Sequence, residues 1–190
     1  MKLALLLSLI TGAAAFAPAK QASTSTALSA TDYSSEVGVT APLGLWDPWN
    51  ILDTASDEKY ARLRATELKH GRVAMLGVVG YLVTYAGVRM PGLEDVPAGW
   101  AAWDALPGEV LGQMGMAAIF MEMANRDQTD SAEFDGDFRN GYLDFGWDDK
   151  PDAWKTKKRN IEMNQGRAAM MGLTGLMVHD FMGNVDAILP

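Results

Sequence analysis

The chain has 190 residues, 24 acidic against 16 basic side chains, a formal net charge of −8 and no cysteine. This length fits about one domain, and without cysteine neither disulfides nor thiolate metal sites can stabilise it. The acidic balance excludes the basic stripe of nucleic-acid-binding proteins, so we expect no nucleic-acid partner. The mean hydropathy of −0.03 and the lack of an interior apolar run of about eighteen residues would, on composition alone, indicate a soluble protein.

Residues 1–30 have the composition of a targeting segment. Lys2 precedes an apolar run and then small residues, which is the order of a secretory signal peptide. Residues 20–30 are rich in hydroxyl side chains and alanine and contain no acid, as transit peptides do. A signal peptide followed by a transit peptide resembles the two-part targeting sequence of proteins imported into plastids bounded by extra membranes. The alternative is an ordinary signal peptide with a disordered tail. Both interpretations leave residues 31–190 as the mature domain.

The first predicted helix covers about residues 57–88. Ser56 is a candidate N-cap, and acidic residues follow it, where the helix dipole favours negative charge. No charged residue occurs from 73 to 88, and Arg89 followed by a Pro-Gly pair ends the pattern. A helix of nearly thirty residues is about 45 Å long, enough to cross a bilayer obliquely.

Two further helices are predicted, at about residues 107–126 and 154–182. The middle helix starts at Pro107 and is apolar except for Gln113 and Glu122 in its interior. The last helix ends at a Gly-Asn helix-stop signal. The connecting segments are rich in Gly, Pro, Asp and Trp and read as loops with at most short helical turns. We therefore predict an all-α membrane protein with three transmembrane helices.

The first and third helices carry an internal repeat, in which residues 64–83 align with residues 159–178. Nine of the twenty aligned positions are identical. The identical positions of the first copy are Arg64, Glu67, Gly71, Arg72, Ala74, Met75, Gly77, Gly80 and Val83. A shared apolar composition does not account for the matched Glu, Gly-Arg and Gly positions, so we predict a pseudo-twofold axis between the two helices.

The repeat predicts two reciprocal ion pairs, since a twofold axis brings each glutamate to the arginine of the other helix. The pairs are Glu67 with Arg167 and Glu162 with Arg72. A charged side chain at membrane depth costs about 2.5–3.5 kcal/mol, so a partner is expected for each. Small residues at three- and four-residue spacing would let the backbones approach; they are Gly71, Ala74, Gly77, Gly80, Gly166, Ala169, Gly172 and Gly175.

Several polar side chains in these apolar helices are candidate ligands for magnesium. A carboxylate has more acceptor sites than one arginine fills, so each repeat glutamate can also offer an oxygen to a hard cation. His70 and Gln165 follow the glutamates by three residues, on the same side of each helix. His179 follows Gln165 by fourteen residues, which places it on nearly the same face of the helix and about 21 Å further along the axis. Two ligands at this separation would suit planar pigments in opposite leaflets. Gln113 and Glu122 address opposite faces of the middle helix.

Each candidate ligand also has a plain structural interpretation. A lone membrane histidine or glutamine is more often a satisfied polar group than a ligand, and Gln113 taken alone supports both readings equally. Glu122 can serve as an ion-pair partner near the helix end, for example of Arg126. The occurrence of all these polar side chains together, several of them at matched positions of the repeat helices, favours a role as magnesium ligands over these separate structural roles.

The motifs Glu67-Leu-Lys-His-Gly-Arg and Glu162-Met-Asn-Gln-Gly-Arg resemble those of the chlorophyll a/b and a/c light-harvesting antenna family, and the resemblance extends over about residues 38–183. It implies that the repeat helices cross as an X locked by the Glu–Arg pairs, with carotenoids in the grooves beside the crossing. It also implies axial ligands of chlorophyll magnesium at Glu67, His70, Glu162, Gln165 and His179, with Gln113 and Glu122 serving the middle helix.

Residues 38–49 and 138–148 are similar to the chlorophyll a/c branch of algae with secondary plastids. This implies chlorophyll a, chlorophyll c and a carotenoid such as fucoxanthin or peridinin as cofactors. It further implies a multi-pass thylakoid protein whose partners are a photosystem I or II core, neighbouring antenna proteins and thylakoid lipids. The family usually has Asn at the position of Gln165 and often Gln at that of His179, and both changes keep a ligand atom. Only seven residues follow Gly183, so we expect the family's amphipathic C-terminal helix to be missing or vestigial.

The expected function is to absorb light and pass excitation to a photosystem without catalysis. The chain has two histidines and no cysteine, and neither histidine has triad or zinc spacing, which argues against a soluble helical enzyme. A photoprotective member of the same family is the nearest alternative. A pigment-free membrane scaffold or transporter subunit is an alternative of a different class, but it leaves His70, Gln165 and His179 unexplained.

Overall fold

The computed structural model of the chain describes residues 32–124, 133–134, 136–139 and 145–189. The segment interpreted as a targeting peptide, residues 1–30, therefore lies outside the described residues. So do residues 125–126, the expected end of the middle helix, and residues 140–144 of the stretch similar to the chlorophyll a/c branch.

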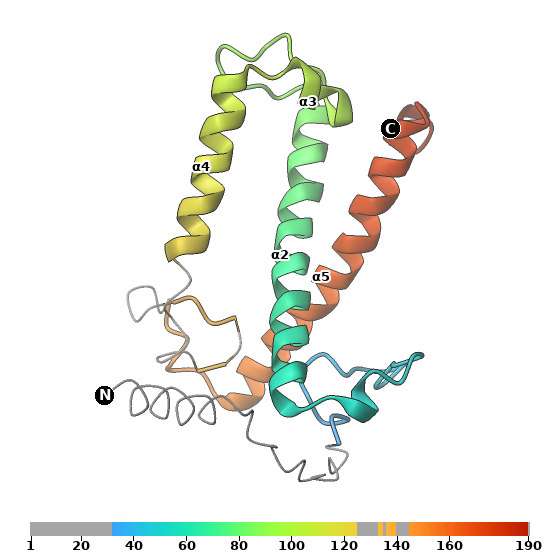
Figure 1. The fold of residues 1–190 in the computed structure, drawn as a ribbon, viewed down its shortest axis with the longest axis vertical. Helices are drawn as coiled ribbons and strands as arrows, with labels where there is room; N and C mark the ends of the chain where they lie inside the picture. The colour runs from blue at the N-terminus through green and yellow to red at the C-terminus, as the bar shows by residue number, and fades with distance from the viewer. Residues whose placement is uncertain (1–31, 125–132, 135, 140–144, 190) are drawn as a thin grey trace, which may run out of the picture.

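The described residues are mostly helical (Figure 1). The helices are α2 (Asp57–Tyr85), α3 (Ala102–Ala105), α4 (Gly108–Ala124) and α5 (Asp152–Phe181), with 3-10 turns η2 (Leu52–Thr54), η3 (Gly99–Ala101) and η5 (Val185–Ala187). In the described ranges the only β pairing is an isolated bridge between Thr40 and Gly44. This agrees with an all-α fold.

The ends of α2 follow from local hydrogen bonding. The Ser56 side chain caps the start by accepting from the Lys59 N–H at 3.3 Å. The helix ends at Tyr85, three residues before the expected end, because Gly87 takes a φ of +85° and turns the chain away. The Thr84 carbonyl at the helix end accepts from the Gly87 N–H and from the guanidinium of Arg89.

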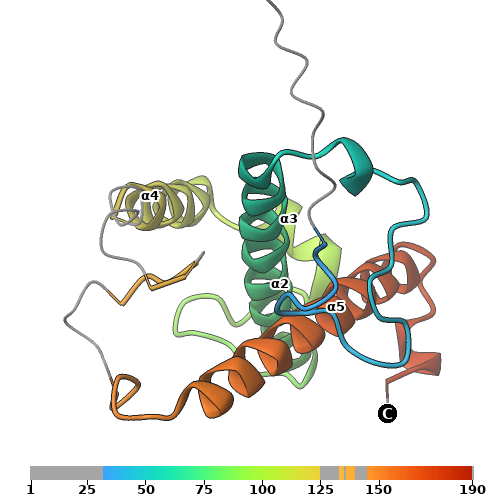
Figure 2. The same cartoon turned by 90° about the horizontal axis from the view of Figure 1, so that it is seen from below.

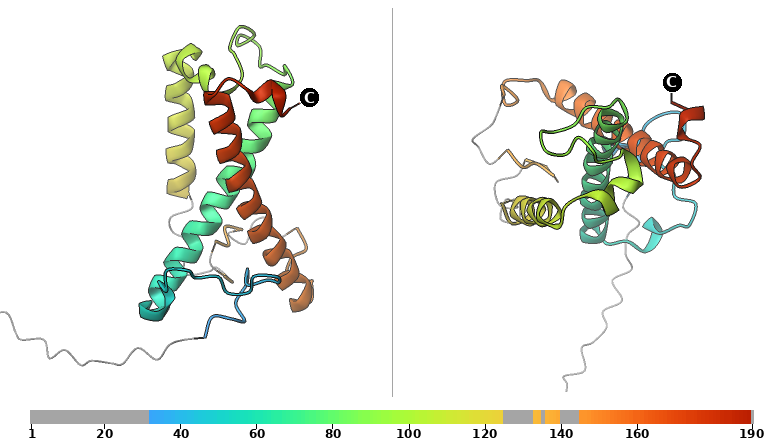
Figure 3. Two further views of the ribbon diagram at one scale, coloured as in Figure 1. Left: turned by 90° about the vertical axis from the view of Figure 1, so that its right-hand side faces the viewer. Right: turned by 90° about the horizontal axis from the view of Figure 1, so that it is seen from above.

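The long helices α2 and α5 cross as an X (Figure 3, left). Their backbones meet at Gly71 and Gly166, which are both buried. A Cβ atom added to Gly71 would lie 3.0 Å from the Cα of Gly166, closer than packed side chains tolerate. Glycine at both positions therefore allows the crossing.

The small core surrounds this crossing, and the helices separate on either side of it. Leu68, Ala74 and Met163 are buried beside the two glycines. Further along α2, a Cβ on Gly77 would meet the side chain of Leu173 at 2.9 Å.

The sequence predicts that the small residues of the repeat let the two backbones approach, and this is confirmed at Gly71 and Gly166 but wrong for three other glycines. A Cβ added to Gly80, Gly172 or Gly175 would have no non-local atom within 4 Å. The physical reason is the crossing geometry: two straight helices that cross at an angle can touch closely over only a turn or two.

Helix α4 stands apart from the crossing (Figures 1 and 2) and has no buried residue. Six of its large apolar side chains are between 56% and 70% exposed; they are Met114, Met116, Ile119, Phe120, Met121 and Met123. An apolar surface of this kind is stable only when another molecule or an apolar medium covers it.

The sequence predicts three membrane-spanning helices. Measured by length and apolar content together, none of the helices in the described part of the chain qualifies as a membrane span.

Aromatic and polar contacts tie the loops to the two ends of the crossed pair. At one end, the ring of Tyr33 stacks on that of Tyr60 at 4.0 Å. At the other, the carboxylate of Asp180 accepts hydrogen bonds from the Trp100 N–H at 2.5 Å and from the Tyr81 hydroxyl at 3.1 Å. The loops are thus held over both ends of α2 and α5.

We predict that replacing Gly71 with alanine destabilises the fold, because the new methyl group must push α5 away at the crossing. The expected loss is about 1–3 kcal/mol, as for other overpacked cores. The measurement is the midpoint of thermal unfolding, followed by circular dichroism.

Gly80→Ala is the matched control, since the same change in the same helix meets open space and gains helix propensity. The close-approach argument is contradicted if Gly71→Ala is as stable as Gly80→Ala.

Candidate functional site

Both ion pairs expected from the repeat are present at the crossing. Nε of Arg167 lies 2.8 Å from Oε1 of Glu67, and Nε of Arg72 lies 2.7 Å from Oε1 of Glu162. The four side chains are between 30% and 39% exposed. Each helix thus contributes the glutamate of one ion pair and the arginine of the other.

Each of these arginines also holds a loop with a second nitrogen. Nη1 of Arg167 donates to the Gly38 carbonyl at 2.7 Å, and Nη1 of Arg72 donates to the Gly136 carbonyl at 2.8 Å. The two glycines have φ of +89° and +83°, in the region that favours glycine. Each precedes the helix that carries the paired glutamate, so the pseudo-symmetry extends into the loops.

The sequence interpretation missed these loop contacts. The sequence did offer a signal for them. A guanidinium carries five N–H groups, more than one carboxylate can accept, so each arginine needs further acceptors.

The two glutamates differ in their second oxygen. Oε2 of Glu67 accepts from Arg64 at 2.8 Å. The equivalent Arg159 instead lies over the Phe134 ring, 4.2 Å from its centroid. Among the described residues Oε2 of Glu162 therefore has no hydrogen-bond partner, and this carboxylate keeps more lone pairs free for a ligand.

Hydrogen bonding determines the tautomer of both histidines. Nδ1 of His70 lies 2.8 Å from the Thr66 carbonyl, and Nδ1 of His179 lies 2.9 Å from Oδ1 of Asn184. Both partners are oxygen acceptors, so in the neutral ring the proton is on Nδ1 and Nε2 keeps its lone pair. A metal-binding histidine characteristically donates its other N–H in this way.

The remaining candidates lie on the helix surfaces. Gln113 on α4 and Gln165 on α5 are exposed. Glu122 on α4 pairs with Lys69 of α2, with Nζ and Oε2 at 2.8 Å. The alternative partner, Arg126, lies outside the described residues. The Lys69 pair connects α4 directly to α2.

The two glutamates lie at the crossing, each paired with an arginine of the opposite helix, and His179, Gln113 and Glu122 lie elsewhere on the helices. The described residues contain no cluster of three or more metal-ligating side chains. Ligands that occur singly or in pairs do not suit a bare magnesium ion, which needs six donors. They suit a metal that brings most of its ligands with it.

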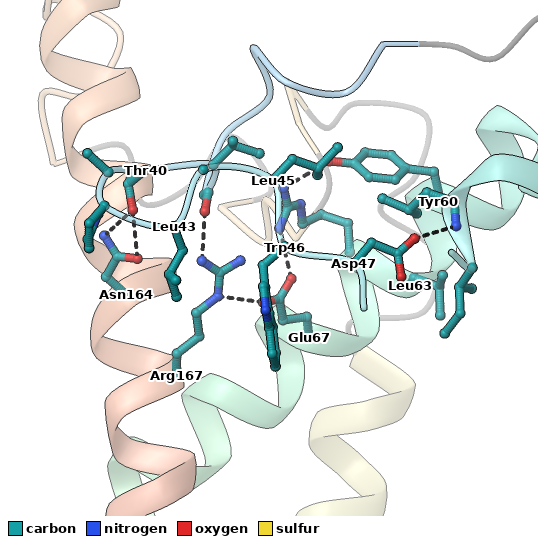
Figure 4. A pocket seen from close by; sticks show the side chains of 18 of the residues that line it. Thr40, Leu43, Leu45, Trp46, Asp47, Tyr60, Leu63, Glu67, Asn164 and Arg167 are labelled. Atoms are coloured by element: carbon teal, nitrogen blue, oxygen red, sulfur yellow. Dashed lines mark hydrogen bonds and ion pairs between the residues drawn. The ribbon is translucent and has the colours of Figure 1, made fainter. Parts of the chain in front are cut away.

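A cavity of about 750 Å³ lies beside the Glu67–Arg167 pair (Figure 4). Its walls are the loop of residues 38–52 and the facing sides of α2 and α5. Large apolar side chains line much of it, among them Leu43, Leu45, Trp46, Leu63, Met170 and Met171. This volume falls in the range of pockets that bind organic cofactors.

A charged cluster orders the loop that Arg72 holds. Two guanidinium nitrogens of Arg139 donate to the buried Asp137 carboxylate, at 2.7 and 2.8 Å, and with the backbone N–H groups of Glu133 and Arg139 they lower the pKa of Asp137 to about 2. The ring of Trp147 lies under the Arg139 guanidinium, 5.3 Å from centroid to carbon. Asp137 therefore stays charged in mild acid, and this anchor persists there.

The chain is similar to known proteins along its whole length. The profile of the family described as "Chlorophyll A-B binding protein" matches residues 33–181. Fucoxanthin-chlorophyll a-c binding protein A, chloroplastic, of Phaeodactylum tricornutum is 44% identical, with 100% of both chains covered. Protein D of the same name and organism is 46% identical over 96% of this chain and 97% of its own. The corresponding Trieres chinensis protein is 45% identical over 96% of each.

We predict that the two ion pairs contribute unequally. Among the described residues Arg72 is the only cation paired with Glu162, so Arg72→Leu removes that partner, whereas after Arg167→Leu the Glu67 carboxylate still has Arg64. Loss of a charged hydrogen bond costs about 1.5–3 kcal/mol, so both variants should assemble less well than the native chain, Arg72→Leu the worse. The measurement is the yield and thermal midpoint of the folded protein.

Arg62→Leu is the matched control, because Arg62 is exposed on the same helix as Arg72. Equal yields for the Arg62 and Arg72 variants would refute the role of the pair.

Proposed function

Because this chain belongs to the chlorophyll a-b binding protein family, we propose that it is a light-harvesting antenna protein that binds chlorophyll a, chlorophyll c and fucoxanthin. It passes the absorbed energy to a photosystem and is not an enzyme. The observation that carries the proposal is the pair of histidine rings whose Nδ1 hydrogen bonds, among the described residues, leave the Nε2 lone pairs for a ligand.

The separated ligands fit chlorophyll. Its macrocycle brings four nitrogen donors to magnesium, so the protein need supply only one axial atom at each site. We assign this role to Glu67, His70, Glu162, Gln165 and His179, and to Gln113 and Glu122 on α4. At the crossing the arginines neutralise the glutamates, so that a neutral ring meets no unpaired charge.

The Lys69–Glu122 pair repeats this arrangement at α4. Its cation neutralises the carboxylate through Oε2, which leaves Oε1 available to a magnesium. In this proposal the ion-pair and ligand roles of Glu122 are compatible.

Pigments also account for surfaces that the protein does not cover by itself. The cavity beside Glu67 has the volume and apolar walls for part of a chlorophyll or carotenoid. The exposed apolar side chains of α4 would be covered by macrocycles on one side and lipid tails on the other. The physical work of the protein is then to fix the separation, orientation and polarity around each pigment.

We place the protein in the plastid thylakoid membrane, with α2, α4 and α5 crossing it and α2 and α5 related by a pseudo-twofold axis. The three relatives named above are called chloroplastic. At 29 residues α2 is about 44 Å long, enough for an oblique crossing. Residues 1–30 would serve as signal and transit peptide, and residues 31–190 as one pigment-binding domain. Photosystem I or II cores, neighbouring antennae and thylakoid lipids are the proposed partners.

The first test is the pigment content of the native complex. Protein purified from thylakoids in mild detergent should yield chlorophyll a, chlorophyll c and fucoxanthin on extraction and chromatography. Its excitation spectrum should show energy transfer from fucoxanthin to chlorophyll a. A native preparation without chlorophyll would support the pigment-free scaffold instead.

The second test addresses one ligand. His70→Leu should remove about one chlorophyll per polypeptide while the helices persist, since leucine has no lone pair. Thr66→Val is the matched control, because it keeps the backbone carbonyl that accepts from His70 and should keep every pigment. An unchanged chlorophyll content in the His70 variant would exclude His70 as a ligand.

A further inference from the structure

The C-terminal end of α5 forms a Schellman motif that places Asn184 against His179. Gly183 has a φ of +69°, the Asn184 N–H donates to the His179 carbonyl at 3.1 Å, and the Gly183 N–H donates to the Asp180 carbonyl at 3.0 Å. The helix-stop signal recognised in the sequence therefore also fixes which side chain lies next to the imidazole.

Asn184 contacts His179 twice. Its backbone donates to the His179 carbonyl, and its side-chain oxygen lies 2.9 Å from Nδ1 of the ring. The first bond holds the position of Asn184, and the second holds the orientation and the proton of the ring. Without the second bond the proton can move to Nε2, which would remove the lone pair that a metal needs.

The two histidines differ in the source of this acceptor. His70 uses the Thr66 carbonyl, one turn earlier on its own helix, and no side-chain substitution can remove it. His179 uses a side chain beyond the end of α5. Its tautomer therefore depends on the identity of one residue.

The surface around His179 suits a flat apolar ring. Val178, Phe181 and Met182 are 50%, 86% and 55% exposed. Met182 follows His179 by three residues and therefore lies on the same side of α5, where it offers apolar packing surface next to the imidazole.

We propose that Asn184 is the positioning residue of the His179 site: it holds the imidazole in the Nδ1–H tautomer so that Nε2 can bind the magnesium of a chlorophyll. The inference rests on the proposed function. Loss of such a supporting hydrogen bond typically weakens metal affinity by about 10–100-fold.

The test uses complexes of the full chain reconstituted with chlorophyll a, chlorophyll c and fucoxanthin. The absorption difference between native and His179→Leu complexes identifies the band of this chlorophyll. In Asn184→Leu the same band should be lost at limiting chlorophyll and recover only at about 10–100-fold higher concentration. Asn184→Asp keeps the acceptor oxygen and should restore the band.

A second variant of His179 distinguishes a positioning role of Asn184 from general structural support of the helix end. In His179→Gln the ligand is an amide oxygen, which has no tautomer to select, so adding Asn184→Leu should change nothing further. An equal loss caused by Asn184→Leu in both backgrounds would overturn the inference, and so would a full band in Asn184→Leu alone. If His179→Leu loses no chlorophyll, this ligand assignment and the inference both fail, while pigments at the remaining sites still uphold the antenna function.

Discussion

The close approach of α2 and α5 at Gly71 and Gly166 is the constraint on which the rest of the structure depends. Only because the backbones touch there can each arginine reach the glutamate of the opposite helix. The same guanidinium groups then anchor the loops at Gly38 and Gly136. One contact between two small residues thus organises two helices, two ion pairs and two loops, and it places both carboxylates at the centre of the molecule.

In the proposed function the ion pairs also prepare the site for a neutral ligand. A carboxylate and the arginine that binds it carry no net charge together, and the carboxylate keeps lone pairs, so the pair can face a macrocycle without an uncompensated charge in an apolar setting. The histidines follow a related logic, since a hydrogen bond at Nδ1 leaves Nε2 free. In each case a protein contact occupies one side of the polar group and leaves the other side available for a metal.

Helix α4 shows what the polypeptide leaves to its surroundings. It reaches α2 through the Lys69–Glu122 pair, and in the described residues none of its side chains is buried. A protein core normally supplies the apolar contacts that hold such a helix. In the proposed function pigments and lipid supply these contacts, and folding is then coupled to pigment binding, because only the bound state covers the apolar surface.

The sequence by itself determined the all-α fold, the approximate helices and the partners of both ion pairs. Helix signals and an internal repeat can be recognised from the order of residue types alone. It also identified Gly183 and Asn184 as a helix stop. Only the tertiary structure decided that Arg64 joins Glu67, that Lys69 pairs with Glu122, that the glycine rows part after Gly77, and that Asn184 bonds His179. These contacts depend on the angle at which the helices cross and on the paths of the loops, and the spacing of residues along one helix predicts neither.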